Sequence, residues 1–284
     1  MRWQGRRGSR NIEDRRRAGP AQGAKVGGIG VLLVVAIGYI LGVDVTPLLN
    51  DQAALRSSGA TGGGMLSAEE KAAGEFVSVT LADTEEIWAE IFRRQVGRPY
   101  EPTTLVLFSG ATRSACGGAS GATGPFYCPL DRRIYLDTAF FTTLARRMGA
   151  GGDFAAAYVV AHEVAHHVQD ELGILSEATA LRRRLPQEQS NAVSVRVELQ
   201  ADCYAGIWAR HAHEMFGTLE RGDVAEAMNA ARQIGDDTLQ RNAGQRPMPH
   251  TFTHGTSAQR QRWFQRGLES GDMASCDTFG ARQL

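Results

Sequence analysis

"AHEVAHHVQD", residues 161–170, places three histidines and a glutamate in an otherwise largely apolar stretch. The whole sequence of 284 residues contains only 7 histidines, so their concentration here needs an explanation. His162, Glu163 and His166 form the motif H-E-x-x-H. Residues four positions apart on an α-helix differ in direction by only about 40°, so both imidazoles can reach one metal ion. The stretch therefore predicts a helix with a metal-binding face.

The predicted helix has clear ends and two different faces. Asp153 is a suitable N-cap, and Gly173 follows the last turn. His162 and His166 share one face, and an apolar stripe occupies the other. The stripe consists of Ala157, Val160, Ala161, Val164, Val168 and Leu172. An amphipathic core helix explains the stripe but not the histidine pair. A short motif of this kind also occurs by chance, so a metal site needs further support.

A second segment offers that support. A catalytic zinc site usually has three protein ligands and one open position. The best third ligand lies 32 residues after His166, in "RVELQADCYAGIWA", where Glu198 and Asp202 are again four apart on one helical face. Apolar neighbours favour a buried metal shell over a solvated helical face. We predict Glu198 as the third ligand and Asp202 as the carboxylate that accepts a hydrogen bond from His162.

Charge is distributed unevenly along a chain that is neutral overall. Its 31 basic and 31 acidic residues balance, and 43% hydrophobic and 22% charged residues are ordinary for a globular protein. Residues 1–25 carry eight basic and two acidic side chains, a net charge of +6. The remaining residues therefore carry a net charge of −6, which gives no reason to expect nucleic-acid binding by the main domain.

An uncharged segment follows the basic one. Residues 26–43, "VGGIGVLLVVAIGYILGV", form 18 residues that are enough to cross the hydrocarbon core of a bilayer as a helix. Because positive charge stays in the cytoplasm, we expect a single-pass anchor with residues 1–25 cytoplasmic and the C-terminal part outside the cytoplasm. A buried soluble helix fits poorly with five glycines, and a cleaved signal peptide fits poorly because no A-x-A-like site follows.

The rest of the chain divides at a stretch rich in glycine and serine. Residues 44–66 contain "RSSGATGGG", a composition typical of a flexible linker. Residues 67–284 then read as one domain, which begins with a capping box formed by Ser67 and Glu70. Its predicted elements are a helical region at 67–97, a strand at 103–110, a hairpin or bent strand at 126–137, and mainly helices thereafter. The expected class is α+β, mainly helical, with a small sheet, preceded by one transmembrane helix.

The chain has four cysteines, Cys116, Cys128, Cys203 and Cys276. An even number in a domain outside the cytoplasm suggests two disulfides. Pairing Cys116 with Cys128 would close a Gly-rich loop and leave Cys203 with Cys276. The alternative is a cysteine-based zinc site, which is less consistent with the absence of any C-x₂-C spacing.

Five ordered segments carry a family resemblance. They are "ACGGASGATGPFYCPLDRRIYLD", "GDFAAAYVVAHEVAHHVQ", "VRVELQADCYAGIWA", "IGDDTLQ" and "THGTSAQRQRWF". From about Gly74 to Phe279 the chain resembles the putative neutral zinc metallopeptidase family, whose members are often membrane-anchored bacterial proteins. That family is similar to zincins whose third ligand is glutamate. The resemblance implies a zincin-like metallopeptidase domain, an active-site helix beneath a small sheet, and one Zn²⁺ per chain.

The same residues predict a mechanism. A zinc ion held by His162, His166 and Glu198 lowers the pKa of a bound water to about 7. Glu163 lies too close along the helix to be a good fourth ligand. We therefore expect it to take the proton of the attacking water as general base.

A further donor is needed to stabilise the oxyanion. We favour His254, in "THGTS" before a helix capped by Ser257, although a structural turn histidine explains it nearly as well. Tyr204 and Arg260 are weaker candidates. His167 lies off both faces of its helix and is expected to be solvated or to contact a ligand residue.

We therefore predict a membrane-anchored zinc metalloendopeptidase that hydrolyses peptide or protein substrates. The strand "RRIYLD", residues 132–137, favours a peptide because an exposed strand edge can pair with an extended backbone. Two alternatives remain. One is a metal-dependent hydrolase of another substrate. The other is a catalytically inactive, zinc-bearing scaffold tethered to the membrane, which would not need Glu163 as a general base.

Overall fold

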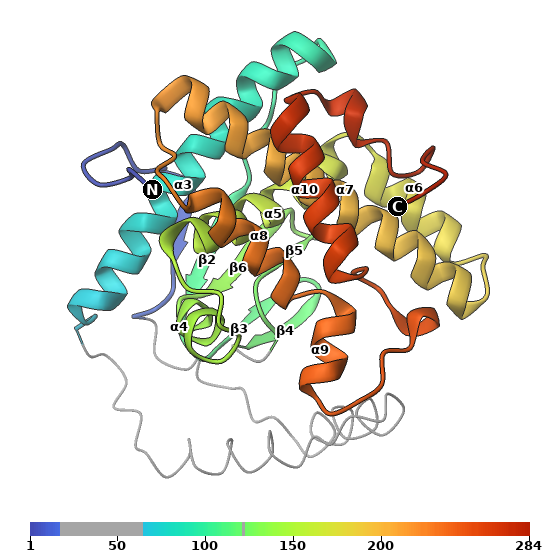
Figure 1. Cartoon of the computed structure of the whole chain (residues 1–284). Coiled ribbons are helices and arrows are strands. Elements are labelled where there is room, and N and C mark those ends of the chain that lie inside the picture. The colour runs from blue at the N-terminus through green and yellow to red at the C-terminus, as the bar shows by residue number, and fades with distance from the viewer. Residues whose placement is uncertain (18–64, 121–122) are drawn as a thin grey trace.

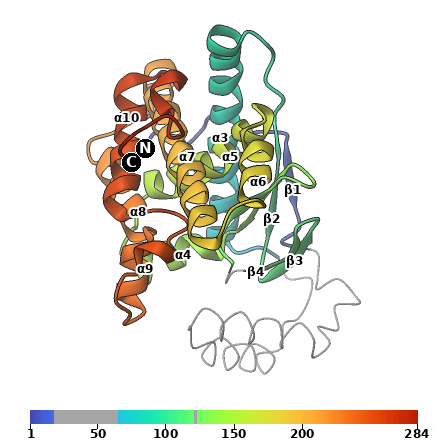
Figure 2. The same ribbon diagram turned by 90° about the vertical axis from the view of Figure 1, so that its right-hand side faces the viewer.

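The computed structural model describes residues 1–17, 65–120 and 123–284. Its elements, in chain order, are β1 (Ile12–Asp14), α3 (Ala68–Ile91), the π-helical turn η1 (Phe92–Val96), β2 (Thr104–Phe108), β3 (Ala111–Ser114), β4 (Gly117–Ser120), β5 (Phe126–Cys128), β6 (Arg133–Asp137), α4 (Ala139–Arg146), α5 (Asp153–Glu171), α6 (Ile174–Arg182), α7 (Gln187–Phe216), α8 (Asp223–Gln233), α9 (Asp236–Asn242), the 3-10 turn η2 (Pro249–Thr251), α10 (Ser257–Ser270) and the 3-10 turn η3 (Met273–Cys276). The small sheet, α5, and then α7 and α10 follow one another as layers (Figures 1 and 2). The predicted class, mainly helical with a small sheet, is confirmed.

In the described part of the chain, four strands form the main sheet, in the order β1-β2-β6-β5. β1, β2 and β6 are parallel, and β5 is antiparallel to β6. Successive side chains of a strand point to opposite faces of its sheet. Leu105 and Leu107 of β2 therefore join the main core with the helices, whereas Val106 and Phe108 pack with Ala119 of the β3–β4 hairpin on the other face. Both faces are covered, which explains why β2 is a nearly continuous apolar run.

The strand expected at 103–110 and the hairpin expected at 126–137 are confirmed as β2 and as β5 with β6. The expectation that residues 132–137 present an exposed edge is wrong. β6 lies between β2 and β5, so both of its edges are paired, and β5 is the strand at that side of the sheet.

Residues 1–17 pack against the domain that we expected to begin at residue 67. The three residues of β1 pair with Leu105–Leu107 of β2. Arg6 donates a hydrogen bond of 2.5 Å to the buried carboxylate of Asp83 on α3. The expected boundary is therefore wrong for residues 1–17, which belong to the same folded unit as the helices.

The predicted membrane anchor, residues 26–43, lies outside the described residues. Among the residues that the structure does describe, no helix is long and apolar enough to span a membrane. The pairing of β1 with β2 requires residues 1–17 to be on the same side of any membrane as the rest of the described chain. That pairing and a single crossing by residues 26–43 exclude one another. The single-pass topology with a cytoplasmic N-terminus stays a prediction, because residues 26–43 lie outside the described residues. It conflicts with the pairing of β1 and β2.

Helix ends agree with the sequence, except for two caps. The capping box of Ser67 and Glu70 is confirmed at the start of α3. Gly173 follows α5 with φ of 79°, a left-handed conformation that ends the helix at the expected place. Two predicted N-caps are wrong by one residue. The N-cap of α5 is Gly152 rather than Asp153, and the N-cap of α10 is Thr256 rather than Ser257. In α10 the cap is a capping box closed by the Gln259 side chain.

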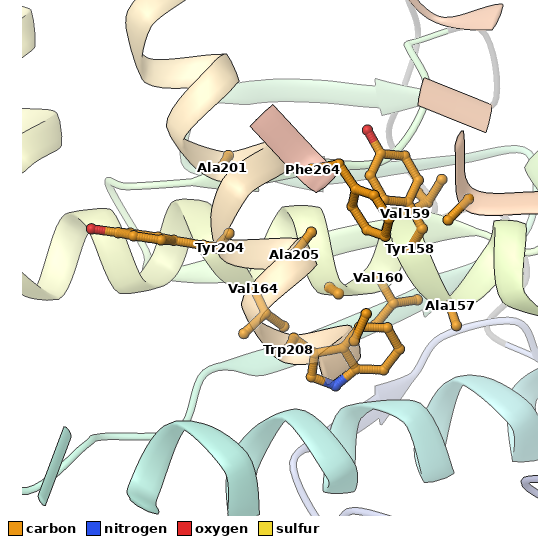
Figure 3. Packing of buried hydrophobic residues seen from close by; sticks show 14 of the residues in the cluster. Ala157, Tyr158, Val159, Val160, Val164, Ala201, Tyr204, Ala205, Trp208 and Phe264 are labelled. Carbon is orange, nitrogen blue, oxygen red and sulfur yellow. The ribbon is translucent and has the colours of Figure 1, made fainter. Parts of the chain in front are cut away.

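The core joins α5, α7 and α10. Apolar side chains of α5, such as Val160 and Val164, pack against those of α7, such as Trp208 (Figure 3). α7 and α10 approach closely because each has a glycine at the contact. A Cβ atom on Gly206 would lie 2.0 Å from the Phe264 carbonyl oxygen, and one on Gly267 would lie 1.8 Å from the Cys203 carbonyl oxygen. Any side chain at either glycine would separate the two helices.

Both expected disulfides, Cys116–Cys128 and Cys203–Cys276, are present. The first joins the β3–β4 hairpin region to the end of β5. The second joins α7 to the 3-10 turn after α10 and is buried, since both of its cysteines are 0% exposed. The two bridges therefore tie the β3–β4 hairpin to β5 and tie η3 to α7.

Candidate metal site and catalytic cleft

Two helices bring the three predicted metal ligands together. His162 and His166 lie on α5, and Glu198 lies on α7. Nε2 of His162 is 3.1 Å from Oε2 of Glu198, and Nε2 of His166 is 3.5 Å from Oε1. One ligand atom from each of the three residues lies within 4.8 Å of the other two. In a tetrahedral zinc site with bonds of 2.0–2.2 Å, neighbouring ligand atoms are roughly 3.3–3.6 Å apart. The donor types and their separations therefore fit a zinc ion.

A hydrogen bond at Nδ1 of His166 leaves Nε2, the nitrogen that faces Glu198, as the one that could bind a metal. The side-chain NH₂ of Gln169 donates to the Val197 carbonyl oxygen at 2.8 Å and to Oε1 of Gln200 at 3.0 Å. The amide oxygen of Gln169 must then be an acceptor, and it lies 2.9 Å from Nδ1 of His166. Nδ1 therefore carries a proton, and Nε2, which faces Glu198, is the nitrogen that could bind a metal.

Asp202 lies beside His162, although the hydrogen bond predicted between them is not aligned. Nδ1 of His162 is 3.0 Å from Oδ1 of Asp202, as a close charge contact rather than an aligned hydrogen bond. Asp202 is itself fixed by three donated hydrogen bonds. Arg260 donates from Nε at 2.8 Å and from Nη2 at 2.9 Å, and the Tyr158 hydroxyl donates at 2.5 Å. This network directs Nε2 of His162 towards the shared site.

Arg260 has a different role from the one considered for it. Its side chain is 2% exposed and is neutralised by the fully buried Asp202, so its charge is not free to meet an oxyanion. The close packing of α10 on α7 places this guanidinium within reach of Asp202. Tyr204 is excluded as an oxyanion donor because it is buried against Trp88, away from the cleft.

The charges at the site stabilise one another. Burial opposes ionisation of Glu198, but the two histidines outweigh burial and hold the pKa of this carboxyl well below its usual value. Burial also opposes ionisation of Asp202, and Arg260 and His162 together lower its pKa. For His162, burial lowers the pKa, but Asp202 and Glu198 more than offset this and raise it to about 10. Both carboxyl groups are therefore anionic near neutral pH, as a cation site requires.

A cavity of about 520 Å³ opens over this site. Its lining includes His162, His166 and Glu198, and Glu163 of α5 reaches it although that side chain is largely buried. Phe126 and Tyr127 of β5 line the cavity as well, so the strand at the sheet edge borders the cleft. Glu163 is therefore placed to meet a molecule in the cavity without being one of the convergent ligands.

His254 also lines the cavity, and a residue that we did not predict holds it there. Oδ1 of Asp236 is 3.1 Å from Nδ1 of His254. Oδ2 of Asp236 accepts hydrogen bonds from the backbone N–H groups of Thr253, His254 and Gly255, at 2.8, 2.6 and 3.0 Å. Burial lowers the pKa of His254, but Asp236 and the charge of Glu198 offset this and raise it. The carboxylate of Asp236 thus fixes the loop and its imidazole together.

His167 does not belong to the site. Its ring is buried, with Nδ1 3.2 Å from the Tyr127 hydroxyl and Nε2 2.7 Å from the Glu101 carbonyl oxygen. The expectation that it is solvated or contacts a ligand residue is wrong, because it joins the far side of α5 to β5 and to the segment before β2. Gln169 and Asp236 are the residues that sequence reasoning missed. A signal existed for Asp236, which starts a helix in the quoted segment "IGDDTLQ".

Comparison with known proteins agrees with this geometry. A family model described as "Putative neutral zinc metallopeptidase" matches residues 1–279. "Uncharacterized protein YpfJ" of Escherichia coli K12 is 45% identical over 289 residues, which cover 99% of each chain. "Uncharacterized protein Rv2575" of Mycobacterium tuberculosis H37Rv is 45% identical over 195 residues, which cover 65% of each chain. No solved structure matches this chain. The chain belongs to the putative neutral zinc metallopeptidase family.

Proposed function

We propose that this protein is a zinc-dependent peptidase in which Glu163 is the general base. The observation that supports this most directly is the convergence of two imidazole Nε2 atoms and one carboxylate on one point of a cleft. A purely structural zinc site is usually closed by four protein ligands. Here three converge among the residues that the structure describes, and a glutamate that is not one of them lines the same cavity.

Each residue at the site has a separate task. A zinc ion at this point would supply Lewis acidity and make a water molecule more acidic. His162, His166 and Glu198 would hold that ion, with Asp202 and Gln169 fixing the two imidazoles. Glu163 accepts the proton of the attacking water and returns it to the leaving amine.

His254 would be the donor to the developing oxyanion. Its Nδ1 is occupied by Asp236, which leaves Nε2 available, and the ring is 48% exposed. The raised pKa of His254 favours the protonated ring, which donates a stronger hydrogen bond to a negative oxygen than a neutral ring does. Asp236 then acts as a positioning residue.

The sheet edge supports a peptide substrate. Within the described residues β5 is an edge strand that pairs only with β6, and Phe126 and Tyr127 line the cavity. An extended peptide could add to this edge by main-chain hydrogen bonds. The sequence predicts that a peptide pairs with residues 132–137. Because β6 is covered on both edges, we propose instead that the peptide pairs with β5.

Glu163→Gln in the full chain tests the proposal. Glutamine keeps the shape of the side chain but cannot accept the water's proton. Zinc content should stay at one ion per chain, whereas cleavage of a mixed peptide library should fall by roughly 10²–10⁴-fold. Glu177→Gln, an exposed glutamate on α6, is the matched control and should leave cleavage unchanged.

Two results would contradict the proposal. Equal cleavage by wild type and Glu163→Gln would mean that another base acts or that a contaminating protease is present. A zinc-loaded wild type that cleaves no peptide would favour the alternative, a catalytically inactive zinc-bearing scaffold.

A further inference from the structure

Helix α6 forms one wall of the cleft. Leu175, Thr179 and Arg182 line the cavity. Their spacing of four and three residues places them on one face of the helix. This face changes along its length from apolar to cationic. Seven residues of helix span about 10 Å, so Arg182 lies about 10 Å along the wall from Leu175.

The position of this wall is fixed relative to the metal ligands. Ala178, at the flank of this same face of α6, is 4% exposed and packs with Val193 and Val197 of α7. Val197 directly precedes the predicted ligand Glu198 and also lines the cavity. A side chain on the cleft face of α6 is therefore held at a set distance from the reacting centre.

Arg182 carries a charge that the fold does not use. Of the described residues, two arginines line the cavity, Arg182 and Arg260, and Arg260 is neutralised by Asp202. Arg182 is exposed, and within the described part of the chain it has no ion pair and no side-chain hydrogen bond. A cation at a helix C-terminus can also serve only the helix dipole. Arg183 and Arg184 follow it, are also exposed and do not line the cavity, so they could serve the dipole as well.

We propose that Arg182 determines specificity by binding a carboxylate of the peptide substrate, an inference that rests on the proposed peptidase function. A guanidinium binds a carboxylate through two parallel hydrogen bonds. The carboxylate is an acidic side chain or the C-terminus of the peptide. An extended peptide advances about 3.3 Å per residue, so this group lies about three residues from the one that contacts Leu175.

The test uses the full chain and matched peptides in which each position in turn is Glu or Gln, with free or amidated C-termini. Wild type should cleave the preferred carboxylate peptide about 3- to 10-fold better, by kcat/KM, than its neutral partner. Arg182→Ala should bring that ratio close to one, and Arg182→Glu should invert it. Arg183→Ala should keep the wild-type ratio. If replacing a Glu of the peptide by Gln lowers kcat/KM, the bound carboxylate is that side chain. If amidation lowers it, the bound carboxylate is the C-terminus of the peptide.

A binding measurement separates this inference from the proposed function. Zinc-loaded Glu163→Gln should bind the same peptides without cleaving them, and fluorescence anisotropy gives their relative affinities. If wild type cleaves nothing but this binding preference depends on Arg182, the peptidase proposal fails and the carboxylate site stands. An unchanged ratio in Arg182→Ala, or an equal loss in Arg183→Ala, would overturn the inference.

Discussion

Two ion pairs that join distant segments of this protein differ in how far water reaches them. At the candidate metal site, the side chains of Arg260 and Asp202 are 2% and 0% exposed. Where residues 1–17 dock onto α3, the side chains of Arg7 and Glu86 are 58% and 46% exposed. The first pair is part of a closed network with Tyr158, and the second is open to solvent.

The difference in exposure implies a difference in energetic weight. The attraction between two charges increases as the local dielectric constant falls. Removing one partner of a buried pair leaves an uncompensated charge and costs about 3–5 kcal/mol. An exposed pair adds little stability and is screened by salt. The site should therefore respond strongly to single substitutions, whereas the docking of residues 1–17 should tolerate most of them.

The largest effect that we expect is on zinc binding. Glu198→Ala removes a ligand and should abolish stoichiometric zinc in the purified chain. Asp202→Asn leaves all three ligands but loses the carboxylate that orients His162, so zinc affinity should fall on the order of 10–100-fold. Metal analysis and competition with a chelator measure both effects. Glu214→Gln, an exposed residue on the same helix, is the control.

Full zinc occupancy in Glu198→Ala would move the third-ligand role to another residue. Wild-type zinc affinity in Asp202→Asn would mean that the buried network only supports folding. A stability measurement on the same variants separates loss of metal from loss of fold.

The grouping of the candidate metal ligands could be predicted from sequence because their spacing is local. His162 and His166 are four apart on one helix, and so are Glu198 and Asp202 on another. A helix converts that spacing into a shared face without reference to the rest of the fold. The sequence therefore indicates which side chains share a helical face, although not the distance between the two helices.

Contacts between distant segments could not be predicted in this way. Asp236 meets His254 across a loop, and β1 pairs with a strand about 90 residues later. β1 has only three residues, too few to show strand alternation, and its basic surroundings were more typical of a cytoplasmic flank. Such partners depend on how helices and strands pack, which no local spacing encodes.

A smaller effect is expected from Asp236→Asn, in the cleft wall. Asp236 raises the pKa of His254, so the neutral amide should lower it. If protonated His254 donates to the oxyanion, activity falls as pH rises through its pKa. The alkaline limb of the kcat/KM profile should therefore move to lower pH in Asp236→Asn, with zinc content unchanged. His254→Ala should lose this limb, and an unmoved limb in Asp236→Asn would assign it to another group.

The smallest effects are expected where residues 1–17 dock, and two neighbouring arginines offer an internal control. Arg7→Ala removes an exposed pair and should give no resolvable change in the denaturation midpoint. Arg6→Ala leaves the buried carboxyl of Asp83 without its partner, at a cost of roughly 1–3 kcal/mol near pH 7.

The loss in Arg6→Ala should depend on pH in a defined direction. Burial raises the pKa of Asp83 to about 6, although Arg6 opposes this, whereas the unfolded value is near 3.8. An acid with a raised folded pKa stabilises the fold fully below its unfolded pKa and loses that contribution as pH rises through the folded value. At pH 4–5 Asp83 is mostly protonated in the folded state, so removing the charge of Arg6 should cost little stability there. Denaturation curves of the full chain should therefore show a smaller difference between wild type and Arg6→Ala at pH 5 than at pH 7. A difference that is the same at both pH values would mean that Asp83 is ionised throughout this range, which would contradict its raised pKa.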